Sequence, residues 1–218
     1  MSHSQAPSIV CPRVDPVWWD APADCAGWPS LQMKQAWREA PDAAFAPATV
    51  QVAWDGARLL VRAALVDRDI FNPEQRFNAP AFLVGDAFEL FIRPADQDAY
   101  CEFHVTPHNQ LFQLRIPSAE QLAACRGAGI QEAWKISAWR IESAAFIDAS
   151  EARWTVAARL PLERLCEQSR PRTGSEFLVS FSRYDYTRGQ AQPVHSSTSA
   201  HAKLDFHRQQ EWRRIVLG

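Results

Sequence analysis

The stretch GDAFELFIRP, residues 85–94, decides the fold class of this chain. Its apolar positions 88, 90 and 92 alternate with a second set that includes Glu89 and Arg93. Successive side chains point to opposite faces of a β-strand, so the stretch predicts a strand with one face against an apolar core. Its other face carries the carboxylate of Glu89 and the guanidinium of Arg93, and the question is what these charged groups contact.

The sequence remains typical of β-strands in both directions from this stretch. TVQVAW and ARLLVRAALV flank the turn Asp55-Gly56, which predicts a β-hairpin. Only Ser118–Cys125 and Leu162–Gln168 indicate helix, the first with Ser118 as N-cap. Many short strands with few helices predict an all-β protein, mainly an antiparallel β-sandwich with one or two short helices. After the hairpin the strand candidates are GDAFELFIRP, AYCEFHVTP, QLFQLRI, WKISAWRIE, RWTVAARLP, EFLVSFSRYD and WRRIVLG.

No linker divides the chain, so we expect one domain over residues 24–218, preceded by an N-terminal extension over residues 1–23. The first fifty residues are rich in Pro and Ala, and their frequent turn signals predict loops and short strands that wrap over the sandwich. The side chains expected to anchor this wrap are Trp18, Trp19, Trp28 and Trp37.

Composition excludes several classes of function. The 218 residues have a formal net charge of -2, so nothing indicates binding to nucleic acid or to an anionic membrane. The five cysteines are odd in number and form no CxxC pair, which argues against a disulfide framework or a thiolate zinc site. We find no signal-peptide pattern and no apolar run long enough to span a membrane. We therefore expect a cytoplasmic protein with reduced thiols.

Polar residues share one face of the predicted strands. Besides Glu89 and Arg93, this face is expected to carry Glu102, His104 and Thr106 from AYCEFHVTP, Gln113 and Arg115 from QLFQLRI, and Ser180, Ser182 and Tyr184 from EFLVSFSRYD. The pattern alone favours a solvated sheet face. Solvated faces usually carry Lys, Glu and Thr, however, whereas this one offers planar donors, acceptors and aromatic rings. A sugar-binding face is the second interpretation.

The ordered set of motifs resembles carbohydrate-binding module family 9, within the wider DOMON-like group. The resemblance runs through VAWDGARLLVRAALVDRDI, GDAFELFIRP, AYCEFHVTP, RWTVAARLPLERL, FLVSFSRYD and DFHRQQEWRRIVL, and covers roughly residues 24–218. It implies a β-sandwich that binds the ends of small saccharides without catalysis. In such modules two Trp rings clamp the sugar, while Glu, Arg and amide side chains bind its hydroxyls.

The family's residues map unevenly onto this chain. Its Glu falls on Glu89, preceded by Asp86, and its Arg falls near His104. The upstream Trp of the clamp falls near Leu83, with Phe82 beside it. The downstream Trp falls near Phe206, next to His207, and the family's amides fall near Ser180 and Ser182. The resemblance and the polar face together predict the ligand-binding set Phe82, Glu89, Arg93, His104, Ser182, Arg183, Tyr184, Phe206 and His207. Arg183 reaches this face only if a bulge lies near Ser182, because simple alternation sends it to the opposite face.

Other constellations have weaker support. Asp67 and Asp69, near Asn72, offer oxygen ligands for a structural calcium ion, although a solvated turn explains them better. No other cofactor is expected. A zinc pair of His104 and His108 is disfavoured by Pro107 and the strand context, and Met33 is better explained by packing than by haem ligation. His195 and His201 are interpreted as ordinary loop histidines.

We therefore expect a stand-alone, non-catalytic domain that binds a small saccharide. The alternatives are an interaction domain, a binder of another small ligand or, with less support, a sugar-active hydrolase using Glu89 and Glu102 as acid and base.

Overall fold

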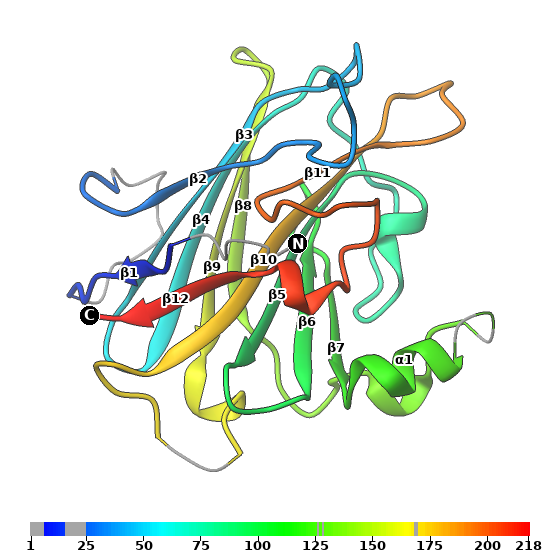
Figure 1. The fold of residues 1–218 in the computed structure, drawn as a ribbon. Helices are drawn as coiled ribbons and strands as arrows, with labels where there is room; N and C mark the ends of the chain where they lie inside the picture. The colour runs from blue at the N-terminus through cyan, green and yellow to red at the C-terminus, as the bar shows by residue number, and fades with distance from the viewer. Residues whose placement is uncertain (1–6, 16–24, 126, 128, 168–169) are drawn as a thin grey trace.

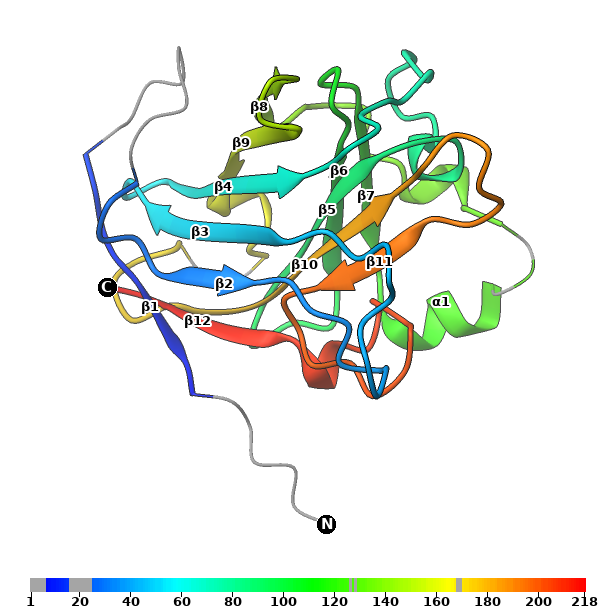
Figure 2. The same ribbon diagram turned by 90° about the horizontal axis from the view of Figure 1, so that it is seen from above.

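Two β-sheets pack face to face in the computed structural model, which describes residues 7–15, 25–125, 127, 129–167 and 170–218 (Figure 1). In spatial order, the larger sheet contains β1 (Ile9–Cys11), β12 (Arg213–Leu217), β10 (Glu176–Asp185), β5 (Ala87–Pro94), β6 (Tyr100–Val105) and β7 (Leu111–Ile116), and β11 (Val194–Ser197) pairs with the end of β10. The smaller sheet contains β2 (Ser30–Gln32), β3 (Ala48–Trp54), β4 (Arg58–Val66), β9 (Arg153–Pro161) and β8 (Glu142–Asp148). Figure 2 shows the two layers.

Neighbouring strands in the described residues run antiparallel except β1 and β12, which run parallel. The all-β sandwich is confirmed. The division into an extension over residues 1–23 and a domain from residue 24 stays a prediction, and β1 shows that residues 9–11 form an edge strand of the larger sheet. Trp18 and Trp19 lie outside the described residues.

The hairpin predicted at Asp55-Gly56 connects β3 and β4. Asp55 Oδ1 accepts hydrogen bonds from the backbone N–H groups of Ala57 and Arg58, and Gly56 has a φ of +96°, a backbone conformation that glycine adopts without strain. The short side chain of Asp and the absence of Cβ in Gly together explain why the chain reverses here.

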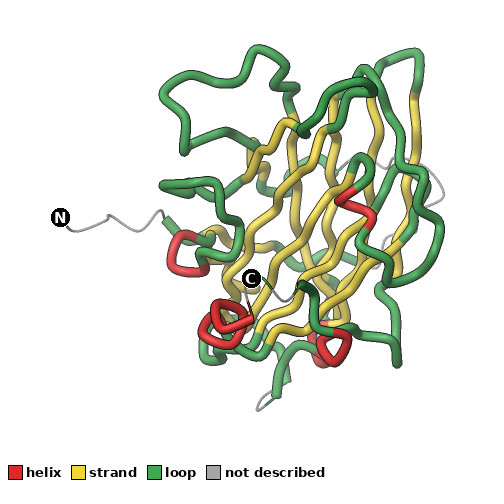
Figure 3. The backbone as a smooth tube through the Cα atoms, turned by 90° about the vertical axis from the view of Figure 1, so that its right-hand side faces the viewer, coloured by secondary structure: helices red, strands yellow, loops and turns green. Residues whose placement is uncertain are grey.

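The helical segments are short and lie around the strands (Figure 3). The helix α1 (Ala119–Cys125) begins where Ser118 Oγ accepts a hydrogen bond from the N–H of Gln121, which confirms the predicted N-cap. The second helical prediction becomes the single turn η3 (Leu162–Arg164). The remaining turns in the described residues are η1 (Ala81–Leu83), η2 (Glu132–Trp134) and η4 (Gln209–Glu211).

One predicted strand was wrong and one strand was missed. WKISAWRIE, residues 134–142, is mostly irregular, and the strand β8 follows it at Glu142–Asp148. The side chains of β8 are half-buried or exposed because it is an edge strand paired with β9 alone, so they show no apolar alternation. β11 was missed for a similar reason, since it is a four-residue edge strand in a Ser-rich segment.

Phe88, Leu90 and Ile92 lie in the core between the sheets, as predicted from GDAFELFIRP. They pack with Phe103 of β6 and Phe181 of β10, and the rings of Phe88 and Phe181 stack at a centroid distance of 6.2 Å. The opposite face of β5 therefore points away from the smaller sheet, and it is this face that carries Glu89.

The outer face of the larger sheet also carries an apolar cluster. Phe112, Leu114 and Ile116 of β7 lie on this face, because Phe112 pairs with His104 and Leu114 pairs with Glu102. The prediction had placed Gln113 there; the structure places Gln113 on the opposite face, where it binds the carbonyls of Ile136 and Trp139. The sequence of β7 alone could not show which of its faces continues the polar face of β6.

Candidate functional site

Two carboxylates and an imidazole occupy adjacent positions on the outer face of the larger sheet. Glu89 of β5 pairs with His104 of β6, and Glu102 lies one outward position further along β6, opposite Phe91. Regular antiparallel pairing places these side chains on one face, which brings residues thirteen to fifteen positions apart in the sequence into contact.

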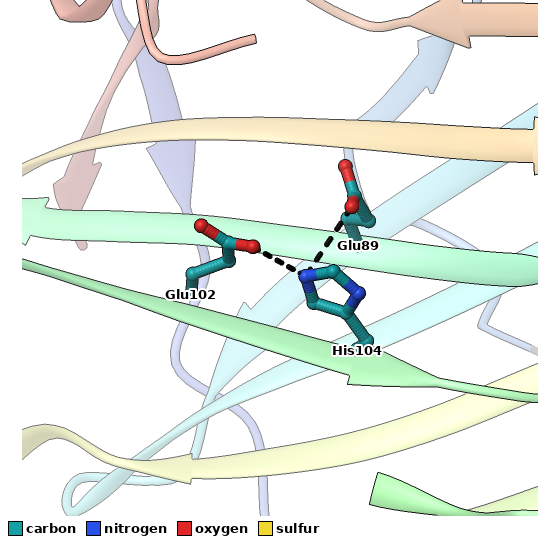
Figure 4. A group of neighbouring side chains, drawn as sticks. All are labelled: Glu89, Glu102 and His104. Atoms are coloured by element: carbon teal, nitrogen blue, oxygen red, sulfur yellow. Dashed lines mark hydrogen bonds and ion pairs between the residues drawn. The ribbon is translucent and has the colours of Figure 1, made fainter. Parts of the chain in front are cut away.

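His104 lies between the two carboxylates (Figure 4). Its Nε2 atom is 2.5 Å from Glu102 Oε1 and 3.2 Å from Glu89 Oε1. The second oxygen of each carboxylate, Oε2, is buried and has no hydrogen-bond partner among the described residues. The group therefore has two polar oxygen atoms left over, and a buried polar atom without a partner costs free energy.

Burial sets the protonation of this group. It raises the pKa of Glu89 to about 8, and the nearby negative charge of Glu102 acts in the same direction. Burial also opposes ionisation of Glu102, but the hydrogen bond and charge of His104 outweigh it and lower the pKa of Glu102. The two carboxylates raise the pKa of His104 against the effect of burial. At neutral pH we therefore assign a proton to Glu89, a negative charge to Glu102 and a positive charge to His104, which leaves the group electrically balanced.

A pocket of about 510 Å³ opens above these carboxylates. Its floor includes Glu89, Glu102 and Phe91. Its walls come from three segments: Phe82 of η1, Tyr184 of β10, and the loop between β11 and β12, which contributes Phe206 and His207. Further polar groups come from His195, Lys203 and Asp205.

The aromatic wall residues hold one another in place. Phe82 lies 5.1 Å from the ring of His104 and 5.4 Å from the ring of Tyr184, as centroid distances. Phe206 is 6% exposed and contacts the rings of Trp37, Phe91 and His195 among others. His207 Nδ1 is 2.7 Å from the hydroxyl of Tyr100, which fixes its ring beside Glu102. The pocket is therefore built from packed side chains on strands and supported loops.

The structure brings six of the nine predicted ligand-binding residues to this pocket or directly beneath it. Five line the pocket, and His104 binds its two carboxylates from below. The five are Phe82, Glu89, Tyr184, Phe206 and His207. Their role in binding stays a prediction.

Three predicted residues lie elsewhere. Ser182 is directly opposite Glu89 in the neighbouring strand, but it is fully buried and its hydroxyl binds Ser197. Arg93 lies near the end of β5, where its guanidinium binds the carbonyls of Pro94 and nearby residues. β10 and β5 pair without a bulge at Ser182, so Arg183 points to the opposite face, as simple alternation requires.

Arg183 belongs to a second buried group of charged residues. Its Nη2 atom is 3.0 Å from Asp67 Oδ2 and 3.0 Å from Asp185 Oδ1. Asp86, close to both aspartates, accepts hydrogen bonds from the backbone N–H groups of Phe71 and Tyr186. Burial raises the pKa of Asp86 to about 8 and that of Asp185 to about 7.

Two groups in the described residues have the composition of cation sites. Carboxylate oxygens of Asp67, Asp86 and Asp185 lie within 4.8 Å of one another, but Arg183 already supplies a positive charge to this group. Asp69, the second predicted calcium ligand, is not part of it, because its carboxylate binds Arg188. The second group is Glu89, Glu102 and His104, whose ligand atoms also lie within 4.8 Å of one another.

Sequence reasoning missed some pocket residues. Glu102 was weighed only as an acid–base partner of Glu89, although its position on the polar face of β6 was recognised. Phe91 and His195 were left out of the predicted set, and Lys203 and Asp205 gave no signal at all. Lys203 and Asp205 come from a loop whose path depends on contacts with the rest of the fold. His108 is exposed at the turn after β6, and Met33 is buried in the core.

Comparison with known proteins identifies the fold. No family model and no curated protein sequence matches the chain. A candidate carbohydrate-binding protein from Bacteroides uniformis has a similar structure, with a TM-score of 0.68, 12% sequence identity, and coverage of 88% of this chain and 87% of that one. Two structures of a carbohydrate-binding module of family 9 from Caldicellulosiruptor kristjanssonii are also similar, at 14% identity each. The complex with cellotriose has a TM-score of 0.66 and covers 97% of this chain and 93% of that one. The complex with glucose has a TM-score of 0.63 and covers 97% of this chain and 96% of that one.

These similarities define the chain as a β-sandwich with the fold of carbohydrate-binding module family 9. The resemblance seen in the sequence motifs is thereby confirmed at the level of the fold. No helix in the described residues is long and apolar enough to cross a membrane.

Proposed function

We propose that this chain is a non-catalytic domain that binds one end of a small saccharide in the pocket above Glu89 and Glu102. One observation carries the proposal: the floor of an aromatic-walled pocket holds two buried carboxylate oxygens that have no hydrogen-bond partner. Sugar hydroxyl groups both donate and accept hydrogen bonds, so they would satisfy the ionised Glu102 as well as the protonated Glu89, and the rings of Phe82 and Tyr184 offer apolar surface to the C–H groups of the sugar. The structural neighbours include a module in complex with glucose and with cellotriose, which supports this choice of ligand class.

The position of His104 favours binding over hydrolysis. A glycosidase places two carboxyl groups on either side of the scissile bond. Here His104 Nε2 contacts an oxygen of each carboxylate, at 2.5 and 3.2 Å, and so occupies the space between them. The two carboxyl groups therefore act together as hydrogen-bonding groups beneath the ligand. Localisation in the cytoplasm stays a prediction.

Isothermal titration calorimetry with glucose, xylose, cellobiose and cellotriose tests the proposal, with and without EDTA. We expect one sugar class to bind in both conditions. The variant Glu102→Gln removes a charged acceptor, and hydrogen bonds to charged groups contribute about 1.5–3 kcal/mol, so binding should weaken about tenfold or more. Glu120→Gln, on the exposed surface of α1, is the matched control and should bind like the wild type.

Four results would contradict the proposal. Absence of binding to all four sugars at tens of millimolar would exclude a site for these saccharides. Equal affinities of the wild type and Glu102→Gln would move the site elsewhere. Binding that is lost with EDTA and restored by a divalent cation would mean that the group of Glu89, Glu102 and His104 acts through a metal ion. Release of product from the oligosaccharides during the titration would indicate a hydrolase.

A further inference from the structure

A second pocket, of about 210 Å³, lies beside the saccharide pocket, between α1 and the edge of the larger sheet. Leu114 and Ile116 of β7 form its sheet side, and Leu122 of α1 faces them. Ile130 and Trp134, which follow α1 in the sequence, contribute further apolar walls. Figure 1 shows α1 beside β7, at the side of the sheet away from β12.

The two pockets adjoin each other. Four residues line both of them: Phe82, Glu102, Leu122 and His207. Glu102 and His207 are the polar residues at this boundary, so a ligand whose hydroxyl groups bind the carboxylates can extend past them into the apolar pocket. The chemistry of the lining changes over this short distance, from carboxylates and polar loop residues to aliphatic and aromatic side chains.

The apolar pocket offers little to water or to a second sugar ring. Leu114 and Ile116 are 3% and 1% exposed and belong to the outer apolar cluster, against which Leu122, Ile130 and Trp134 also pack. Beyond Glu102 and His207 at its boundary, its described side chains are carbon surfaces apart from the thiol of Cys125 and the indole N–H of Trp134. Water in such a space finds few of the two to four polar partners that hold it in a buried site.

The volume fits one aromatic ring. An engineered cavity of about 150 Å³ lined by Leu, Ile and Phe side chains binds benzene. About 210 Å³ therefore accommodates a phenyl ring with a small substituent. We propose that the apolar pocket is a subsite for the aglycone of the bound saccharide, and that the ligands of this domain are glycosides with an aromatic aglycone. This inference rests on the saccharide-binding function proposed above.

Matched pairs of glycosides test the inference. Methyl and phenyl glycosides of glucose, galactose, mannose and xylose are titrated into the protein, with phenol alone as a further ligand. For the sugar that binds, the phenyl glycoside should bind roughly tenfold or more tightly than the methyl glycoside, because a ring-sized apolar area leaves water. Phenol alone should bind far more weakly than the phenyl glycoside.

A variant that fills the apolar pocket tests whether the tighter binding of the phenyl glycoside arises there. Ile130→Trp should abolish the advantage of the phenyl glycoside and leave the affinity for the methyl glycoside unchanged, since Ile130 lines only the apolar pocket. Ile147→Trp, at an exposed position of β8 in the other sheet, is the control and should preserve the advantage. Should Ile130→Trp fail to fold, the indole N–H resonance of Trp134 in the wild type provides a second readout. It should shift with the phenyl glycoside and not with the methyl glycoside.

The outcomes separate the two proposals. Binding of a methyl glycoside without a phenyl advantage overturns the aglycone subsite and leaves saccharide binding intact. A phenyl advantage that persists in Ile130→Trp, with an unshifted Trp134 resonance, also overturns it. Absence of binding to all eight glycosides overturns both proposals.

Discussion

His104 Nε2 lies 2.5 Å from Glu102 Oε1, and both side chains are buried beneath the pocket. Breaking a buried ion pair leaves one charge without compensation, so each member depends on the other for its protonation state. Glu89, 3.2 Å from the same nitrogen atom, adds a third titratable group. The group is electrically balanced only while Glu89 keeps its proton, and this balance has a consequence for stability.

The first prediction is that Glu89 makes the stability of the protein depend on pH. Burial raises the pKa of Glu89 to about 8 in the folded state, whereas the unfolded value is near 4.3. Between these values the folded state binds one more proton than the unfolded state, so its stabilising contribution is complete below about pH 4 and is lost as the pH rises through 8. The slope is about 1.4 kcal/mol per pH unit for one proton.

The variant Glu89→Gln, which resembles the protonated side chain, isolates this contribution. Urea unfolding of both proteins at pH 5, 6, 7 and 8 should show the variant gaining stability relative to the wild type as the pH rises. Asp86 and Asp185 also have raised pKa values, so both proteins keep some dependence on pH and only their difference reports Glu89. A difference that is constant from pH 5 to pH 8 would show that Glu89 is ionised throughout.

The second prediction concerns Phe206, whose ring supports the wall of the pocket. It is 6% exposed and contacts Trp37, Phe91 and Tyr184, so Phe206→Ala removes a large buried side chain. We expect a loss of about 3 kcal/mol or more in the free energy of unfolding, together with weaker saccharide binding. Leu204→Ala, in the same loop at a position that is 48% exposed, should change stability by about 0.5 kcal/mol or less.

Urea unfolding and calorimetry on the same samples separate packing from ligand contact. Near-normal stability of Phe206→Ala combined with lost binding would mean that the ring contacts ligand without supporting the loop. Similar losses of stability in Phe206→Ala and Leu204→Ala would mean that the loop is held by its backbone and not by the ring of Phe206.

Most of the fold could be predicted from the sequence because buried strands carry a strong alternation. β5 and β6 were found in this way, and so was the hairpin of β3 and β4. The edge strands β8 and β11 lack that signal, because no side chain of β8 is buried and β11 is a four-residue strand with a single apolar residue. This explains both the misplacement of β8 and the omission of β11.

The site was predictable where a single strand determines a side chain's face. Glu89 and His104 follow from alternation in β5 and β6, and their contact follows from the pairing of these strands. The positions of Leu114 and Ile116 on the outer face could not be predicted from the sequence of β7 alone. Which side chains of β7 point outward is fixed by the turn between β6 and β7, where Asn109 has a φ of +58°. Lys203 and Asp205 come from a loop, and loop paths depend on packing that no local pattern encodes.

The last prediction concerns Arg183, which the structure places away from the pocket. Its guanidinium, fully buried, lies 3.0 Å from Asp67 and Asp185 and donates to the backbone carbonyl of Val66. Arg183→Leu leaves two buried aspartates without their cation, and we expect a loss of about 3–5 kcal/mol at pH 8. The loss should shrink as the pH falls towards 5, because protonation of Asp185, whose pKa is raised to about 7, then removes one of the uncompensated negative charges.

Arg188→Leu is the control for this variant, since Arg188 forms an exposed pair with Asp69 and should contribute about 1 kcal/mol or less. Urea unfolding at pH 5 and pH 8 measures both effects, and calorimetry on the folded fraction should show saccharide affinity unchanged in Arg183→Leu. A loss of affinity without a loss of stability would mean that Arg183 contacts the ligand after all, which would require β10 to shift by one residue against β5. Such a shift would exchange the two faces of β10, burying Tyr184 between the sheets and turning Phe181 outward. The ion pair of Arg183 with Asp67 and the position of Tyr184 in the pocket wall therefore both depend on the observed register of β10 against β5.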